Sequence, residues 1–345
     1  MFLPATQERG LVVDVVHHAR KPGPRAFSIE RLFADIREGM PPDIRCRSHV
    51  APFRSLGLGP RARNIIDARR HSGQVNHVIG DVHYLALGLP AANTIVTVHD
   101  CGMLLRLRGW RRTVMQVFWF SWPIARCRIV TAVSEATKRD LVEIAGAPPE
   151  KIRVIHNCVS SRFVPEPAAF NASQPRILLI GTSPNKNLGR MAAALAGLAC
   201  AVELVGTPSG EQMAEFERHA VSLRALGDIG ETELHDAYRR CDLVLFASIH
   251  EGFGLPILEA QAIGRPVVTG DCSSMPEVAG GGACLVDPLD PSSIREGVRR
   301  VADSAAYRST LIAAGLENVR RFTVARTAES YAEVYREIAA DSDRA

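Results

Sequence analysis

The sequence predicts an α/β protein of two Rossmann-like domains that face each other across a cleft. A chain of 345 residues is long for one hydrophobic core and fits two domains of ordinary size. Short apolar runs alternate with helical patterns in both halves, as in parallel sheets covered by helices. A stretch rich in Pro, Ser and Ala joins the halves. We therefore expect a first domain over 1–160, a linker over 161–175 and a second domain over 176–322.

The first half contains five apolar runs that we predict to be strands. They are short, which is typical of strands buried on both faces. A helix is expected at 28–38, and another after Ser134, whose hydroxyl can cap the turn that begins EATKRDL. The five runs are 11–18, 75–80, 94–100, 128–134 and 152–157.

The second half shows the same alternation more clearly. Helices are predicted over 187–199, 231–241 and 255–263, and the last of them ends at Gly264, a residue suited to a left-handed cap. Pro256 stands in the first turn of that helix, where its fixed φ is favourable. The predicted strands are 176–182, 201–207, 242–248, 265–270 and 282–288.

Charge is distributed unevenly along the chain. Residues 1–165 hold 24 Lys+Arg and 13 Asp+Glu (+11), and the remainder holds 17 and 24 (−7), which together give the net charge of +4. The basic half could face anionic lipid or a phosphorylated acceptor. Nucleic acid is not expected as a partner, because no arginine-aromatic interleaving or known reader motif is present.

The thiols and the first residues bear on the compartment. The eight cysteines are dispersed without a close pair, which is typical of reduced cytosolic thiols and not of a disulfide framework or a zinc site. The opening MFLPATQERG lacks the pattern of a secretion signal. We therefore expect a cytoplasmic protein.

One apolar stretch, 113–125, is shorter than the about 20 residues that a membrane-spanning helix needs. Arg111 and Arg112 precede it, and Arg126 and Arg128 follow it. Two interpretations stand. The stretch is a buried helix, or it is a surface helix that presses aromatic side chains into a membrane interface with arginines at the head groups. The second would give peripheral contact with the inner face of an anionic membrane.

Two glutamates, Glu251 and Glu259, bracket a loop and a helix start in the run HEGFGLPILEAQAIGRP. Gly252 and Gly254 let backbone N–H groups at the helix start approach a ligand closely, and such groups bind phosphate. Carboxylates on either side suit sugar hydroxyls, which donate hydrogen bonds to them. The order hydroxyl, phosphate, hydroxyl is that of a nucleotide-sugar. An ordinary capped helix with two solvated glutamates would have the same spacing.

This run, with CDLVLFAS before it and SSMPEVAGGGACLVDP after it, resembles the retaining family 4 glycosyltransferases of the GT-B fold, whose Glu-x7-Glu motif it contains. The resemblance covers most of the second half and continues through IGTSPNKNL and ALGDIGETEL. In the first half it reaches TVHD, AVSEATKRDL and IRVIHNCVSSRF. The tail resembles the family's last helix, so residues 323–345 are expected to cross back onto the first domain.

The resemblance implies how a donor would be bound. Glu259 would hold the ribose hydroxyls, and Glu251 would contact those of the transferred sugar. The nucleobase would lie in the segment ALGDIGETEL, at Leu226, Asp228 and Ile229. The diphosphate would lie between the phosphate loop and the helix start, at Gly181, Thr182, Gly252, Phe253, Gly254 and Leu255.

The resemblance also implies the catalytic set, which is His99, Lys186 and Glu251. Lys186 would neutralise the leaving diphosphate, and His99 would lie across the cleft near the transferred sugar. No metal or other cofactor is expected, because a lysine point charge can do at the diphosphate what a metal does elsewhere. Arg25, in KPGPRAFSIERL, would meet the acceptor.

The expected activity is transfer of a hexose, with mannose as the first candidate, from a nucleoside-diphosphate sugar to a saccharide or lipid-linked acceptor. Such a reaction would serve assembly of cell-surface polysaccharide or glycolipid. A nucleotide-sugar epimerase of the same architecture is an alternative. A catalytically silent nucleotide-sugar-binding subunit is another, since Thr182 follows Gly181 where family members often carry an arginine.

Overall fold

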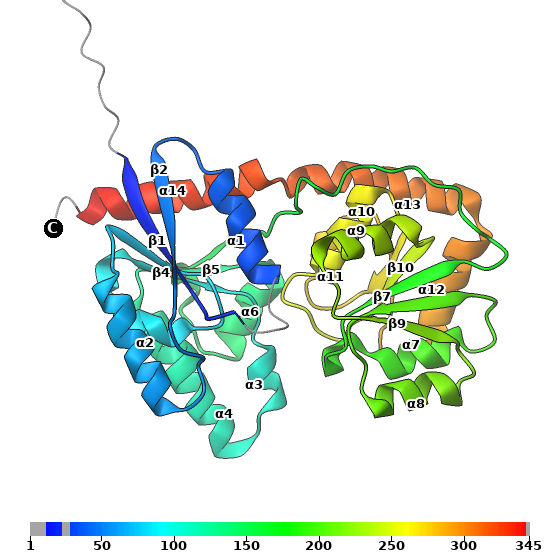
Figure 1. Cartoon of the computed structure of the whole chain (residues 1–345), viewed down its shortest axis with the longest axis horizontal. Coiled ribbons are helices and arrows are strands. Elements are labelled where there is room, and N and C mark those ends of the chain that lie inside the picture. The colour runs from blue at the N-terminus through cyan, green and yellow to red at the C-terminus, as the bar shows by residue number, and fades with distance from the viewer. Residues whose placement is uncertain (1–11, 23–27, 343–345) are drawn as a thin grey trace, which may run out of the picture.

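The computed structural model describes residues 12–22 and 28–342. Two α/β units lie side by side, each built on a six-stranded sheet (Figure 1). All pairs of neighbouring strands are parallel. Apolar clusters pack on both faces of each sheet, as parallel sheets require. The predicted fold class is therefore confirmed.

The first sheet has the strand order β2-β1-β3-β4-β5-β6. Because β1 lies between β2 and β3, the order of the strands reverses at β1 and β3, and a crevice is expected at the carboxyl ends of these two strands. The strands are β1 Val13–Ala19, β2 Ile44–Val50, β3 Val75–Val78, β4 Thr94–Val98, β5 Ile129–Ala132 and β6 Ile152–Val154.

The second sheet has the order β12-β11-β10-β7-β8-β9, which is the arrangement of dinucleotide-binding domains. Its reversal lies between β7 and β10, so the loops that follow these two strands flank the expected ligand position. The strands are β7 Arg176–Ile180, β8 Ala201–Val205, β9 Leu223–Gly227, β10 Leu243–Phe246, β11 Val267–Gly270 and β12 Cys284–Val286.

Helices cover both sheets. In the first unit they are α1 Ser28–Glu38, α2 Leu58–Arg70, α3 Gly102–Arg106, α4 Gly109–Met115, α5 Trp122–Arg126 and α6 Glu135–Glu143. In the second they are α7 Leu188–Leu195, α8 Gly210–Arg218, α9 Glu231–Arg240, α10 Leu255–Ile263, α11 Met275–Ala279, α12 Pro291–Asp303 and α13 Ala305–Asn318.

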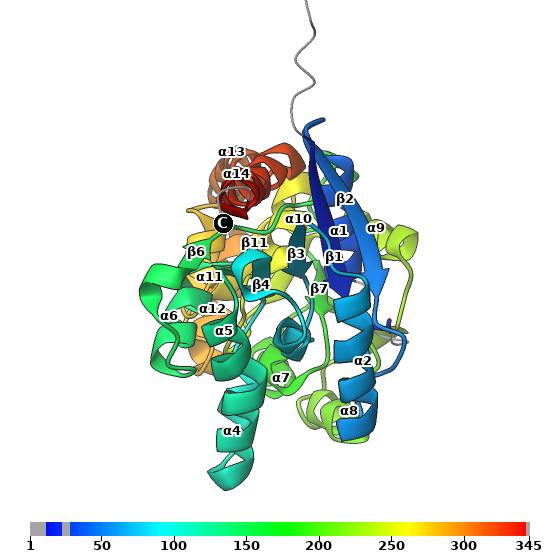
Figure 2. The same ribbon diagram turned by 90° about the vertical axis from the view of Figure 1, so that its left-hand side faces the viewer.

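The last helix, α14 (Val324–Ser342), returns to the first unit (Figures 1 and 2). Tyr331 and Tyr335 are buried there among the first unit's core residues. The Tyr335 hydroxyl lies 3.0 Å from His17 Nε2 and 2.7 Å from His77 Nδ1. These two buried contacts, over 250 residues apart in the chain, fasten the end of the chain to β1 and β3.

All ten predicted strands are present, and two strands were not predicted. β2 reads IRCRSHV and β9 reads LRALG, and both lie at sheet edges. Edge strands keep one side open to water, so polar residues are tolerated and the apolar signal is weak. Ser134 accepts a hydrogen bond from the Thr137 N–H, as its predicted capping role requires.

The apolar stretch 113–125 forms the end of α4, a π-helical segment at Gln116–Ser121 and the start of α5. Its aromatic side chains divide between the core, where Trp119 and Phe120 are buried, and the surface, where Phe118 and Trp122 are exposed. The stretch is therefore buried on one side and exposed on the other, so each of the two interpretations holds for part of it. In the part of the chain that the structure describes, no helix is long and apolar enough to cross a bilayer.

Candidate active site

The start of α10 is the centre of the candidate site. Gly254 has φ 106°, a left-handed value that favours glycine, and Gly264 ends the helix at φ 82°. The helix is buried from Ile257 to Ile263, whereas Leu255 and Pro256 at its start are only partly buried. No described residue accepts a hydrogen bond from the N–H groups of Phe253, Gly254 or Leu255. These groups are free to bind an anion.

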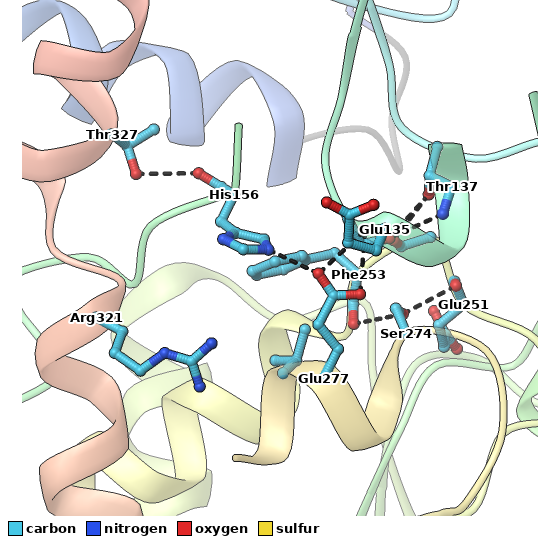
Figure 3. Close-up of polar contacts among 12 residues, drawn as sticks. Glu135, Thr137, His156, Glu251, Phe253, Ser274, Glu277, Arg321 and Thr327 are labelled. Carbon is cyan, nitrogen blue, oxygen red and sulfur yellow. Dashed lines mark hydrogen bonds and ion pairs between the residues drawn. The ribbon is translucent and has the colours of Figure 1, made fainter. Parts of the chain in front are cut away.

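The carbonyl groups of the same loop are held elsewhere. The Ser273 hydroxyl donates to the Glu251 carbonyl at 2.6 Å. The Ser274 hydroxyl lies 3.0 Å from the same carbonyl oxygen and 2.7 Å from that of Phe253 (Figure 3). The Ser134 hydroxyl donates to the Gly252 carbonyl at 2.6 Å. Because the carbonyl oxygens are tied back, the negative ends of these peptide groups are fixed away from the loop's free N–H groups.

Lys186 and Glu251 meet at the reversal point of the second sheet. Lys186 follows β7 and Glu251 follows β10, and Lys186 Nζ lies 2.6 Å from Glu251 Oε1. Both side chains are largely buried, and the ammonium also lies 4.4 Å from the centre of the Phe246 ring. Gly181 makes room for this lysine, since a Cβ at that position would come 2.8 Å from Lys186 Cε. Asn185 Nδ2 donates to the same carboxylate oxygen at 3.1 Å.

Glu259 is buried on the inward side of α10, with 6% of its surface exposed. Its carboxylate accepts hydrogen bonds from the Tyr238 hydroxyl at 2.6 Å and from Arg31 Nη2 at 3.2 Å. Burial raises the pKa of Glu259, although both hydrogen bonds oppose that rise. Arg31 comes from α1 of the first unit, so the Glu259 carboxylate of the second unit accepts a hydrogen bond from a side chain of the first. Neither Tyr238 nor Arg31 could be found from the sequence, because no local pattern marks either partner.

The two units touch closely beside the loop that precedes α10. A Cβ on Gly252 would lie 1.7 Å from the carbonyl oxygen of His99, so the backbones are in contact there and only glycine fits. His99 is buried, and its Nε2 lies 2.9 Å from the Ile79 carbonyl oxygen. The ring of His99 is thereby turned toward β3 of its own unit. The carbonyl oxygen of His99 is therefore the atom of this residue that lies against the loop at Gly252.

Hydrogen bonds to two carboxylates reinforce this junction. His250 Nε2 lies 2.8 Å from Asp140 Oδ2 on α6, and this hydrogen bond raises the pKa of His250 against the effect of burial. Glu277 on α11 accepts from the Glu135 N–H at the start of α6, at 3.0 Å to each oxygen, and lies 2.7 Å from His156 Nε2 (Figure 3). A carboxylate at a helix start is favourable because of the exposed N–H groups.

The remaining residues expected at the site belong to the segment around the end of β9, to the loop after β7 and to a part outside the described residues. Leu226 and Ile229 pack against the apolar cluster that contains Phe253, and Asp228 is exposed at the end of β9. The Thr182 carbonyl accepts a hydrogen bond from Gln212 Nε2 at 2.8 Å, which holds the loop after β7 to α8. The expectation for Arg25 lies outside the described residues.

Comparison with known proteins matches both halves of the chain to family models. A family model described as "Glycosyltransferase Family 4" matches residues 2–163, and one described as "Glycosyl transferases group 1" matches residues 174–304. O-antigen chain mannosyltransferase B of Escherichia coli is 27% identical over 217 residues, which cover 57% of this chain and 57% of that protein. D-inositol 3-phosphate glycosyltransferase of Thermobispora bispora is 30% identical over 238 residues, covering 61% of this chain and 55% of that protein.

These matches therefore span little more than half the length of either relative. The fold has a fuller counterpart in HepE of Anabaena, solved in complex with UDP and glucose. It superposes with a TM-score of 0.75 over 94% of this chain and 100% of that one, at 17% identity. Since the family models match both halves of the chain, the protein belongs to the family 4 glycosyltransferases, and the structural match over 94% of the chain shows the GT-B architecture.

Proposed function

We propose that the protein transfers a hexose from a nucleoside-diphosphate sugar to an acceptor hydroxyl, with retention of the anomeric configuration. The observation that carries the proposal is the order of groups along one element: a buried carboxylate at Glu259, free N–H groups at the start of α10, and the Lys186–Glu251 pair at the reversal point of the sheet. Mannose is the first candidate for the sugar, because the Escherichia coli relative is named as a mannosyltransferase.

The reaction follows from where charge can be stabilised. The bond from the sugar's anomeric carbon to the diphosphate breaks, and negative charge grows on the phosphate oxygen that leaves. Lys186 and the start of α10 stabilise that charge, which requires no metal. The acceptor oxygen forms its bond on the same face, and its proton passes to the leaving phosphate oxygen. Glu251 accepts hydrogen bonds from sugar hydroxyls and is not the nucleophile, since Lys186 and Asn185 already hold its carboxylate.

The acceptor, on this proposal, binds in a cavity of about 370 Å³ in the first unit. The cavity lies at the reversal point of the first sheet, where segments following β1, β2 and β3 meet. Three cations and one carboxylate are among its lining residues, which favours an anionic acceptor such as a sugar phosphate. The lining residues are Arg20, Lys21, Arg54, Ser55, Leu56, Asp81 and Val82.

Arg54 is the cation best placed to recognise that anionic group. Arg20 is already paired, at 2.8 Å from Glu30 and 3.1 Å from Asp81, and Lys21 donates to the Pro52 carbonyl. Arg54 has no ion-pair partner within 12–22 and 28–342. The Thermobispora bispora relative is named for a phosphorylated acceptor, which supports the same class. Arg54→Ala should raise the KM for a sugar-phosphate acceptor and leave the KM for the donor unchanged. An unaltered acceptor KM would exclude this placement.

We also propose that α4 and α5 rest on an anionic membrane that presents a lipid-linked acceptor. α4 has no buried residue and projects from the body of the first unit (Figure 2). Trp110, Val114, Phe118 and Trp122 form an exposed stripe with a spacing of four residues. The neighbouring arginines, with Arg111 5.6 Å from the Trp110 ring, would meet lipid phosphates while the rings enter the interface.

Flotation with anionic vesicles tests this surface. The chain should float with the vesicles at low salt, and a variant with Trp110, Phe118 and Trp122 replaced by serine should not. Replacement of Leu289, which is equally exposed on the second unit, serves as the control. Equal flotation of both variants would show that the stripe is not the membrane contact. A stripe variant that instead loses a protein partner would assign the stripe to that partner.

The reaction itself is tested by incubating the purified protein with UDP-, GDP- and dTDP-linked hexoses, with and without a sugar-phosphate acceptor. Release of nucleoside diphosphate that depends on acceptor supports transfer, and NMR of the product's anomeric proton reports retention or inversion. Epimerised donor would instead identify an epimerase. Thermal stabilisation by a donor without any turnover would identify a silent binding subunit.

A further inference from the structure

Two histidines and an aspartate meet on the outer edge of the first sheet. His49 lies near the end of edge strand β2, Asp67 lies in the last turn of α2, and His71 is the C-cap residue of that helix. Ligand atoms from the three side chains lie within 4.8 Å of one another. We propose that His49, Asp67 and His71 form a binding site for a divalent transition-metal ion, with Zn²⁺ as the ion that imidazole and carboxylate ligands suit.

The hydrogen bonds behind His49 begin at Asn76, whose amide orientation is fixed. Its Oδ1 accepts from the Gly73 N–H at 2.9 Å, and its Nδ2 donates to the Gly73 carbonyl at 3.2 Å. The same Oδ1 lies 3.1 Å from His18 Nε2. Because an amide oxygen only accepts, His18 Nε2 must carry a proton. His18 is fully buried, which disfavours a charged ring, so its Nδ1 is left as an acceptor.

That assignment determines the protonation of His49. His18 Nδ1 and His49 Nδ1 are 3.2 Å apart, so His49 Nδ1 must be the donor. His49 Nε2 then carries a lone pair, and it faces Asp67 Oδ2 at 2.9 Å. Two acceptors at that distance repel each other unless a cation lies with them. A histidine that binds a metal through one ring nitrogen and donates from the other is the usual arrangement in metal sites, and the chain from His49 through His18 to Asn76 provides it.

His71 supplies the third ligand. Its ring stacks on that of His49 with centres 4.3 Å apart, and its Nδ1 lies 3.6 Å from Asp67 Oδ1. In tetrahedral zinc sites with bonds of about 2.0–2.1 Å, ligand atoms are separated by about 3.3 Å. The distances from the Asp67 oxygens to His49 Nε2, 2.9 Å, and to His71 Nδ1, 3.6 Å, lie on either side of that value. His71 Nδ1 is also 2.9 Å from the Asp67 carbonyl oxygen. Because a carbonyl oxygen only accepts, His71 Nδ1 carries the proton of that bond. The ring is half exposed, so a modest rotation and movement of that proton to Nε2 through solvent can free Nδ1 as the third ligand.

The site is separate from the transfer reaction and lies on β2 and α2, away from α10. A bound ion would tie β2 to α2, the two elements that flank the segment 51–57. That segment carries Arg54 and Leu56 of the first-unit cavity. The metal would therefore restrict the movement of segment 51–57, which forms one wall of the cavity.

The test uses the full chain, freed of metal by a chelator and titrated with Zn²⁺ in a calorimeter. One equivalent should bind with a Kd in the micromolar range or below, and the melting temperature should rise as free Zn²⁺ exceeds that Kd. His71→Ala and Asp67→Asn should each weaken binding at least about tenfold. His71 is half exposed, so its variant should fold normally. His219→Ala, on the second unit, is the matched control and should bind as the wild type does.

Co²⁺ in place of Zn²⁺ gives a second readout. Tetrahedral imidazole and carboxylate ligation should produce visible d–d bands without a thiolate charge-transfer band, which excludes the eight cysteines as ligands. Absence of saturable Zn²⁺ binding would show that a proton on His49 is the cation beside Asp67, and would overturn the proposal. Unchanged binding in both the His71 and Asp67 variants would overturn it as well.

Discussion

Replacement of Lys186 by alanine addresses the proposed role of the diphosphate-binding cation. Lys186 Nζ is placed at 2.6 Å from Glu251 Oε1, and only 16% and 14% of the two side chains are exposed. Loss of one such electrostatic group in an active site removes ~3–4 kcal/mol of transition-state stabilisation, so kcat should fall about 100- to 1000-fold. The assay is the initial rate of nucleoside diphosphate release at saturating donor and acceptor.

The same change should also cost stability, because Glu251 would lose its partner in a largely buried position. Asn185 still donates to that carboxylate, so we expect a loss of about 1–3 kcal/mol and a melting temperature lower by several degrees. Lys151→Ala is the matched control, since among the described residues Lys151 donates to the carbonyls of Ala125 and Cys127 and to no carboxylate. A Lys186→Ala protein that is folded and turns over within about threefold of the wild type would refute the assigned role.

Three further predictions concern the junction of the two units. Glu259→Gln should weaken donor binding about tenfold or more in calorimetry, because it removes a charged acceptor of the ribose hydroxyls, and an unchanged Kd would contradict that. Gly252→Ala should lower kcat/KM about 100-fold and open the cleft in small-angle scattering, because its Cβ would lie 1.7 Å from the His99 carbonyl oxygen; a closed, active variant would argue against this contact. The hydrogen bond to Asp140 raises the pKa of His250 above the ordinary value of 6.5, so the stability that this pair contributes is complete below pH 6.5 and is lost as the pH rises through the folded-state pKa. The difference in melting temperature between wild type and His250→Asn should therefore shrink from about pH 5.5 to about pH 9, and a constant difference would exclude the pair as its source.

Much of the fold could be predicted because its information is local. Strands such as LVLF in β10 are buried on both faces and read as continuous apolar runs. The N-cap at Ser134 and the C-cap at Gly264 depend on backbone geometry within one turn of a helix, so a single residue type predicts each helix end. Edge strands β2 and β9 were missed since one side of each meets solvent and admits polar residues.

The candidate site was only partly predictable, for a different reason. Glu251 and Glu259 stand in a motif with a fixed spacing, and Lys186 follows a recognisable loop. Their partners come from distant parts of the chain: Arg31 is 228 residues from Glu259, and no periodicity relates the two. The sequence predicts that Gly252 allows backbone N–H groups to approach a ligand. The structure gives a second reason for a glycine there, because a Cβ would collide with the His99 carbonyl oxygen of the first unit. Contacts between domains depend on how two folded surfaces meet, which local sequence does not encode.

The most direct measurement is a crystal structure of the protein with an intact nucleoside-diphosphate hexose. The account predicts that the diphosphate accepts hydrogen bonds from the N–H groups of Phe253, Gly254 and Leu255 and lies beside Lys186, with ribose hydroxyls on Glu259. A donor bound at the first-unit cavity, or a diphosphate with no contact to the start of α10, would contradict it.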